Sequence, residues 1–289
     1  MSSPSASAGL GLLSAASWGG SDFIGGLGSR RASPLLITAS GQAVSLLLLA
    51  AICFAIHAAL PGTHALLLTA VAGFEAALAL ALFYRALAMG AMGLTAALTG
   101  LTTALAPVAF SILHYGLPAP VTMAGLAAGC IAIWLITHQQ AQGGKAAPAA
   151  ALLMGTLAGF GFGAQLILFK LAEPAGAGGL GGAGILTIMT VARAAGVTAL
   201  LMVLVATRTR ARAQSFWAAG IVSGLMDTAG NLFYLAAARF GRLDAAAVIC
   251  SLYPAGTILL SALVLRERPT RRQMAGMALA LGAVALLSL

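Results

Sequence analysis

The chain has 289 residues, of which 61% are hydrophobic and only 7% are charged. Soluble domains carry about 25% charged residues, so this composition excludes a protein whose whole surface faces water and indicates an integral membrane protein. The formal net charge is +9, but the basic residues gather at the ends of apolar segments. This placement favours contacts with the lipid bilayer and its anionic headgroups, so no nucleic acid partner is expected.

Ten apolar segments follow one another along the chain, and each is close to the roughly 20 residues that a helix needs to cross the hydrocarbon core. They lack the alternation of barrel strands, which leaves helices as the only way to satisfy the backbone inside a bilayer. The predicted spans are 8–28, 35–57, 65–88, 92–113, 119–138, 149–172, 182–206, 216–238, 243–265 and 271–289. The sequence therefore predicts an all-α membrane protein with ten transmembrane helices.

The first segment is expected to remain as a helix. It has no basic residues before its apolar run and contains Trp18, Ser21 and Asp22, which argues against a cleaved signal peptide. The chain has an odd number of cysteines, far apart and inside predicted spans: Cys53, Cys130 and Cys250. This pattern favours small packing residues over a disulfide framework or a zinc site, and no metal or cofactor is expected.

The segment "LFYRALAMG" beginning at Leu82 recurs as "LFYLAAARFG" beginning at Leu232, and the matches around it keep their order. The two half-starts also agree, since "GLLSAASWGG" from Gly11 matches "GTLAGFGFGA" from Gly155. We expect two related units, residues 1–143 and 144–289, with five helices each. Because five is odd, the second unit would cross the membrane in the opposite sense, and such inverted repeats are typical of transporters that open a central site alternately to each side.

Four charged residues fall well inside predicted spans: Asp22, Glu75, Arg193 and Asp227. A charge at mid-depth costs about 2.5 to 3.5 kcal/mol on insertion scales, so these side chains are expected to face the bundle interior or a wet cavity. An alternative is a buried ion pair of Asp227 or Glu75 with Arg193 that only fixes helix packing. Asp22 could equally lie near the membrane surface.

Asp227, Asn231 and Tyr234 fall on one face of their predicted helix and form a polar stripe. Glu75 occupies a similar depth in the matching helix of the first unit. Both acids could line one cavity, and either could couple transport to protons.

Hydroxyl residues precede a proline in one span of each unit. These residues are Thr95, Thr99, Thr102 and Thr103 before Pro107, and Ser251 and Tyr253 before Pro254. A proline breaks a helix and frees a carbonyl one turn earlier, so two such breaks fit a central site for a polar substrate. Alternatively, the threonines bond back to their own helix.

Three segments together resemble the EamA-type, ten-helix members of the drug/metabolite transporter superfamily. They are "SWGGSDFIGGLGSRRASP", "FYRALAMG" and "LRERPTRRQMAGMALALGAVAL". The resemblance implies a secondary transporter of the bacterial inner membrane, without an ATPase domain, that exports amino acids, including aromatic ones, or related metabolites. It favours Trp18, Tyr84, Gln165 and Tyr234 as cavity or gate residues.

The resulting prediction is a non-enzymatic exporter that works by alternating access as a monomer or homodimer. The predicted substrate cavity comprises Trp18, Ser21, Asp22, Glu75, Tyr84, Thr99, Thr103, Gln165, Arg193, Asp227, Asn231, Tyr234, Ser251 and Tyr253. Alternatives are export of drugs, nucleobases or sugars, a membrane-embedded enzyme acting on lipids, and a sensor or scaffold. For orientation, the basic residues after odd-numbered helices place both termini outside, whereas the resemblance implies cytoplasmic termini.

Overall fold

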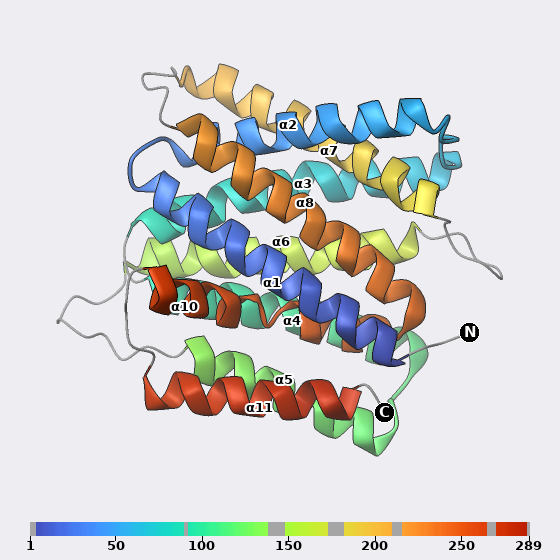
Figure 1. Ribbon diagram of the computed structural model, residues 1–289, viewed down its shortest axis with the longest axis vertical. Helices are drawn as coiled ribbons and strands as arrows, with labels where there is room; N and C mark the ends of the chain where they lie inside the picture. The colour runs from blue at the N-terminus through green and yellow to red at the C-terminus, as the bar shows by residue number, and fades with distance from the viewer. Residues whose placement is uncertain are drawn as a thin grey trace.

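The computed structural model describes residues 4–89, 92–137, 148–172, 182–209, 216–264 and 270–287. The regular elements in these ranges are all α-helices (Figure 1). They are α1 (Pro4–Ser29), α2 (Pro34–Ala55), α3 (Thr63–Ala88), α4 (Met92–Tyr115), α5 (Pro120–Thr137), α6 (Ala149–Leu171), α7 (Gly182–Thr207), α8 (Phe216–Phe240), α9 (Leu243–Cys250), α10 (Tyr253–Val264) and α11 (Arg271–Leu287). The all-α prediction is confirmed, and the helix bounds follow the predicted spans within a few residues. The expected boundary at residues 143 and 144 lies outside the described residues.

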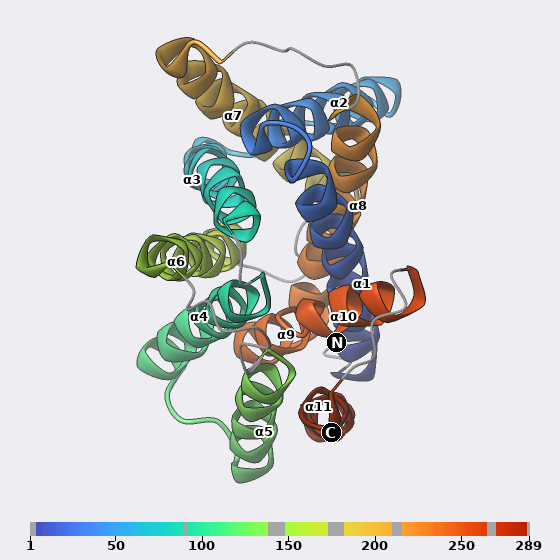
Figure 2. The ribbon, with the colours of Figure 1, turned by 90° about the vertical axis from the view of Figure 1, so that its left-hand side faces the viewer.

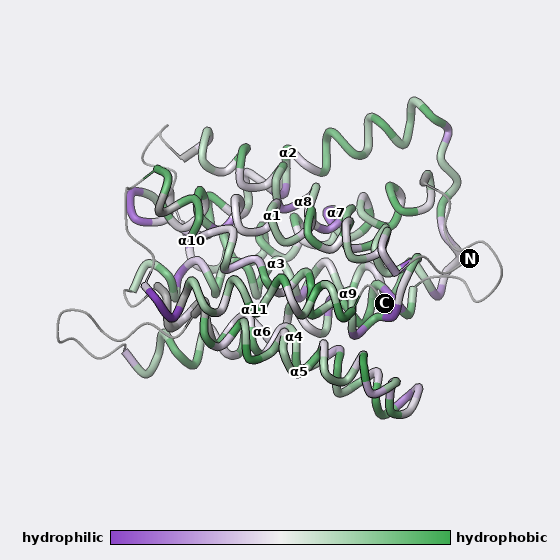
Figure 3. Tube along the Cα trace, turned by 60° about the horizontal axis from the view of Figure 1, so that its bottom comes forward, coloured by the Kyte–Doolittle hydropathy of each residue, from purple (hydrophilic) through white to green (hydrophobic). Residues whose placement is uncertain are grey.

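Five of the described helices contain segments long and apolar enough to cross a membrane by length and composition. The segments are Pro34–Ala55, Thr63–Ala88, Leu98–Tyr115, Ala149–Leu171 and Ala183–Thr207. Apolar residues occupy most of the helix length, and hydrophilic residues gather mainly near the helix ends (Figure 3). The protein is therefore a multi-pass helical membrane protein.

The ninth predicted span, 243–265, is not one helix but two, α9 and α10, separated by a turn at Ser251 and Leu252. Pro254 lies in the first turn of α10. It has no N–H to donate to the carbonyl one turn earlier, so an uninterrupted helix would lose a hydrogen bond at this point. The corresponding expectation at Pro107 is not met, because α4 continues through that residue.

The helices form a bundle in which α1 packs against α8 on one side and α3 packs against α6 on the other (Figure 2). The α2 and α7 helices contact each other at one end of this cross-section, and α5 contacts α11 at the other. The α4, α9 and α10 helices lie between the α5/α11 pair and the rest. The α1/α8 and α3/α6 pairs thus face each other across the centre of the molecule.

The antiparallel seam between α1 and α8 is joined by a ladder of serine hydroxyls. Ser7, Ser14 and Ser21 recur every seventh residue, a spacing that keeps side chains on one helix face. Their Oγ atoms donate to the main-chain carbonyls of Ala237 (3.0 Å), Gly230 (2.8 Å) and Ser223 (2.8 Å), respectively. Each serine thus finds an acceptor on the neighbouring helix where water is excluded.

Glycines allow the backbones of α2 and α8 to touch. A Cβ on Gly224 would clash with the Cα of Gly41, and a Cβ on Gly41 would lie 2.5 Å from the Gly220 carbonyl. A similar contact joins α3 to α7, where a Cβ on Gly73 would overlap the backbone of Ala192. These helices pack through main-chain atoms, so no side chain fits at the contact.

Candidate functional site

A cavity with an empty volume of about 490 Å³, part of it open to the surroundings, lies at the centre of the bundle. Its lining includes many residues of the predicted substrate cavity: Trp18, Asp22, Thr103, Gln165, Arg193, Asp227, Asn231 and Tyr253. These side chains come from α1, α4, α6, α7, α8 and α10. Residues far apart in sequence therefore meet at one site.

An ion pair joins α7 to α8 inside this cavity. Arg193 Nη2 lies 2.6 Å from Asp227 Oδ2, and the two side chains are 4% and 15% exposed. Asn231, one turn further along α8, donates Nδ2 to the main-chain carbonyl of Asp227 (2.8 Å) and to its Oδ1 (3.3 Å). The carboxylate of Asp227 is thus compensated by a guanidinium and an amide, as the ion-pair alternative anticipated.

Asp22 lines the same cavity from α1 and is partly exposed to it. It lies within electrostatic reach of Asp227. Within the described part of the chain, its carboxylate has neither a hydrogen bond nor an ion pair. The cavity therefore contains two carboxylates and one guanidinium.

Several buried polar atoms of the lining lack a hydrogen-bond partner among the described residues. They include Gln42 Oε1, Arg193 Nε and Asn231 Oδ1, on side chains of residues that are 6%, 3% and 2% exposed. A buried polar atom left unpaired costs about 1 to 3 kcal/mol, so such atoms are uncommon in a closed core. Their gathering at one cavity fits a binding site for a polar ligand.

Aromatic rings form another part of the lining. The ring centroids of Trp18 and Tyr253 are 6.4 Å apart in an edge-on arrangement, and Phe162 lines the cavity from α6. Trp18 also stacks on Tyr234, with centroids 6.3 Å apart. The site thus combines charged groups with flat apolar surfaces.

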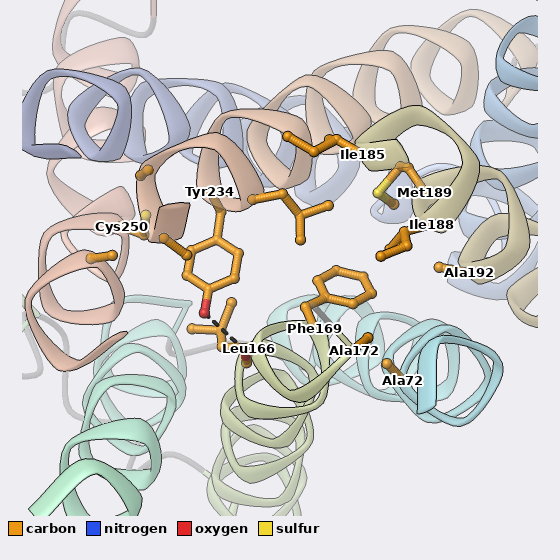
Figure 4. Packing of buried hydrophobic residues seen from close by; sticks show 14 of the residues in the cluster. Ala72, Leu166, Phe169, Ala172, Ile185, Ile188, Met189, Ala192, Tyr234 and Cys250 are labelled. Carbon is orange, nitrogen blue, oxygen red and sulfur yellow. Dashed lines mark hydrogen bonds between the residues drawn. The ribbon is translucent and has the colours of Figure 1, made fainter. Parts of the chain in front are cut away.

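The two tyrosines of the sequence repeat lie outside this lining and make similar bonds. The hydroxyl of Tyr84 on α3 donates to the Ser21 carbonyl of α1 (3.3 Å), and Ser21 Oγ lies 3.3 Å from the same hydroxyl. The hydroxyl of Tyr234 on α8 donates to the Leu166 carbonyl of α6 at 2.8 Å (Figure 4). Tyr84 lines a smaller neighbouring pocket with an empty volume of about 200 Å³, part of it open to the surroundings, and Tyr234 is fully buried.

The other predicted residues also lie away from the lining. Thr99 donates to the carbonyls of Thr95 (2.9 Å) and Gly155 (2.8 Å), so it both bonds back to its own helix and holds α4 against α6. Ser251 is buried at the turn between α9 and α10.

Glu75 lies on α3 beside α6, where a Cβ added to Gly161 would be 2.9 Å from Glu75 Oε2. Its Oε1 is buried and has no hydrogen-bond partner among the described residues. Glu75 therefore takes no part in the ion pair that the sequence allowed with Arg193.

Five lining residues were absent from the sequence prediction: Gln42, Ala76, Leu80, Phe162 and Leu166. Gln42 offered a signal, because it is the only amide side chain in the predicted span 35–57. Phe162 offered a weaker one, since it matches Trp18 in the aligned half-starts. The remaining three are ordinary apolar residues, and only the packing of α3 and α6 brings them to the cavity.

Comparison with known proteins relates the second half of the chain to a described family. Residues 149–289 match the EamA-like transporter family. None of the curated proteins compared matches the sequence. Among solved structures, 27 chains match, and one described as "Crystal structure of protein" superposes with a TM-score of 0.72 at 16% identity, covering 97% of this chain and 95% of its own. At this identity the likeness shows a shared fold.

Proposed function

Because the chain belongs to the EamA-like transporter family, which comprises membrane transporters of small molecules, we propose that it exports amino acids, aromatic ones included, by alternating access. The observation that carries this proposal is the central cavity, which presents carboxylate, guanidinium and amide groups beside aromatic rings. The helix contacts, the pairing of the lining residues and the tyrosine hydrogen bonds support alternating access. We further propose a bacterial inner-membrane location and a monomeric or homodimeric state.

The cavity chemistry suits a zwitterion with an apolar side chain. A carboxylate such as Asp22 can accept hydrogen bonds from an ammonium group, and the unpartnered Nε of Arg193 can donate one to a carboxylate. Trp18, Phe162 and Tyr253 offer surfaces for an aromatic or aliphatic side chain. A site with few polar groups among apolar walls is the usual form of a small-molecule site.

The helix contacts support an inverted repeat of residues 1–143 and 144–289. If α1 to α5 correspond to α6, α7, α8, α9 with α10, and α11, the most extensive contacts have counterparts. The α1/α8 contact matches α6/α3, the α2/α8 contact matches α7/α3, and the α4/α6 contact matches those of α9 and α10 with α1. The inverted repeat implies a twofold axis that relates the two units. The α2/α7, α4/α9 and α5/α11 pairs meet across this axis. Such a twofold relation is what two rocking halves require.

The cavity lining follows the same correspondence. Twelve of the thirteen lining residues fall into pairs that lie 144 to 151 positions apart, and Gln165 is the remaining one. The pairs are Trp18 with Phe162, Asp22 with Leu166, Gln42 with Arg193, Ala76 with Asp227, Leu80 with Asn231, and Thr103 with Tyr253. The α3/α8 pairs differ by one position from the 150-residue offset of Tyr84 and Tyr234. Both members of every pair line the cavity. This pairing supports a central site shared equally by the two units, as alternating access requires.

The tyrosine bonds support closure at both ends of the cavity. Each joins the α1/α8 pair to the α3/α6 pair, through α3 and α1 at Tyr84 and through α8 and α6 at Tyr234. The α1 and α3 helices end on one side of the bundle, and α6 and α8 end on the other (Figure 1). Breaking one bond while keeping the other would open the cavity towards one side only.

Proton coupling is proposed through Asp227 or Glu75, with Asp227 preferred because it lines the cavity and Glu75 does not. The proposed direction of transport is export. The orientation of the termini can be tested separately. Export would follow an outward gradient of amino acid, and a reporter fused to the C-terminus would identify the side on which that end lies.

The direct experiment is transport in proteoliposomes. Purified protein would be reconstituted with labelled phenylalanine, tryptophan and leucine, alongside a nucleobase, a hexose and a cationic dye, with protein-free liposomes as control. Movement of the amino acids, saturable and competed by unlabelled amino acid, is expected. Movement of the other solutes without any amino acid would overturn the amino acid proposal and favour the alternative substrates.

A further inference from the structure

The charged groups of the central cavity are unequally shared among its helices. Asp22 on α1, Asp227 on α8 and Arg193 on α7 all reach the lining, so the site holds two carboxylates for one guanidinium. Arg193 contacts Asp227 at 2.6 Å. The one guanidinium among the described lining residues is therefore already engaged by one of the two carboxyl groups.

Asp22 is left as the anion without a partner. Within the described residues it has no hydrogen bond and no ion pair, and the charge that reaches it from Asp227 is of the same sign. A carboxylate in a cavity inside a membrane protein is costly unless a cation or donors compensate it. Among the described lining residues, Asp22 is thus a carboxyl group without a compensating cation.

The neighbours of Asp22 suit an organic cation. Trp18 lies one helical turn earlier on α1, on the same face, and its ring meets Tyr253 edge-on. Ammonium groups bind favourably against the faces of such rings. An ammonium ion at Asp22 would therefore have both a carboxylate and aromatic surfaces beside it.

The opposite wall is apolar. Leu166 holds the position on α6 that corresponds to Asp22, and Ala76 and Leu80 of α3 hold those that correspond to Asp227 and Asn231. Phe162 lies on the same wall. A solute with a cationic head at α1 and an apolar body towards α3 and α6 would match both walls.

We propose that Asp22 binds the ammonium group of the solute, and that the cavity accepts amphipathic primary amines at least as well as the corresponding amino acids. The assignment rests on the proposed transport function and adds the group that recognises the substrate. An amine brings one positive charge, which balances Asp22. An amino acid also brings a carboxylate, and Arg193 is already neutralised by Asp227.

Equilibrium binding to the full-length protein in lipid nanodiscs tests this assignment. The ligands are phenethylamine, phenylalanine, 3-phenylpropionate and 2-phenylethanol, which share a ring and differ in charge. The amine should bind at least as tightly as the amino acid, and the acid and the alcohol should bind far more weakly. Asp22→Asn should weaken amine binding by about 30-fold or more, as expected for truncating one partner of a desolvated charge pair, while Asp22→Glu should retain much of it.

Asp244→Asn is the matched control, because it makes the same carboxyl-to-amide change at the start of α9, where Asp244 pairs with Arg242 outside the lining. It should leave the amine affinity unchanged. A folded Asp22→Asn variant with unchanged amine affinity would overturn the assignment. Should that variant fail to fold, equal binding of the amine and the alcohol to the wild-type protein would overturn it instead.

The same experiments separate this assignment from the proposed function. Amino acid transport that persists in Asp22→Asn would overturn the role of Asp22 and leave the transport function standing. If wild-type protein neither binds nor moves any amino acid or amine, the proposed function fails and the assignment fails with it.

Discussion

The α1/α8 pair and the α3/α6 pair are packed in corresponding ways but differ in chemistry. In the first, Ser14 donates a hydrogen bond across the seam to the Gly230 carbonyl. In the second, the corresponding residue is Ala158, which packs in an apolar cluster with Phe83 and Tyr84. The contrast continues into the cavity, where Asp22 faces the site from α1 and Leu166 from α6.

This difference separates two requirements of a transporter. Matching helix contacts allow two halves to rearrange in related ways, so packing is expected to stay similar on both sides. Recognition of an asymmetric solute needs unlike walls, so the lining residues are expected to diverge. The pairs Asp227 with Ala76 and Asn231 with Leu80 follow this rule.

The largest effect is expected from breaking the ion pair between Arg193 and Asp227 in the cavity. Asp227→Ala leaves Arg193 as a buried, unpaired cation, which should cost about 3 to 5 kcal/mol of unfolding free energy. Ala76→Ser at the corresponding position of α3 should cost less than about 1 kcal/mol, because the hydroxyl can bond back to its own helix. Denaturant titration in detergent would measure both losses of unfolding free energy. Equal losses would contradict the difference between the charged side of the cavity at Asp227 and the apolar side at Ala76.

A replacement of the whole pair provides the control for that experiment. The double variant Arg193→Leu with Asp227→Leu should recover most of the stability lost in Asp227→Ala, since no unpaired charge remains. It should still lack transport. A double variant as unstable as the single one would indicate that Asp227 acts through contacts other than Arg193.

The next largest effect is expected where the backbones of α2 and α8 meet. Gly224→Ala would place a methyl group against the Cα of Gly41, and overpacking of this kind should cost about 1 to 3 kcal/mol. Gly282→Ala in α11 is the matched control, because nothing lies within 4 Å of the added Cβ. Thermal unfolding that shifts equally in the two variants would argue against the close contact.

Smaller effects with opposite consequences are expected at the two tyrosines. Tyr84→Phe and Tyr234→Phe each remove one hydrogen bond between the α1/α8 pair and the α3/α6 pair. Such a bond is worth about 0.5 to 1.5 kcal/mol. Tyr84→Phe should increase access to the cavity from the side where α1 and α3 end, and Tyr234→Phe from the other side. Labelling of a cysteine introduced at Thr103 in a cysteine-free background, from each face in turn, would measure this. The same direction of change in both variants would contradict the proposed closure at two ends.

The smallest effect is expected in the serine ladder. Ser14→Ala makes the α1/α8 seam resemble the α3/α6 seam at Ala158 and removes one bond to the Gly230 carbonyl. Interhelical hydrogen bonds of this kind average about 0.6 kcal/mol in a membrane protein. A loss of several kcal/mol in the denaturant titration would mean that the ladder supports more than a single bond.

Much of the fold could be predicted from the sequence, because the length of an apolar run is a local property. The ends of α2 and α6 lie within two residues of their predicted spans. The exception is the break between α9 and α10, since Pro107 and Pro254 look alike in sequence and only one interrupts its helix. The surroundings of each proline decide whether the lost hydrogen bond is tolerated.

The sequence by itself determined that the chain is a helical membrane protein, and it marked the charged residues that cannot face lipid. Which of these meet was decided only by the tertiary structure. Arg193 pairs with Asp227 and leaves out Glu75, although both acids lie in apolar spans. The physical reason is that burial cost is set by residue type and depth, whereas partnership depends on which helix faces meet, and those faces come together only when distant segments pack.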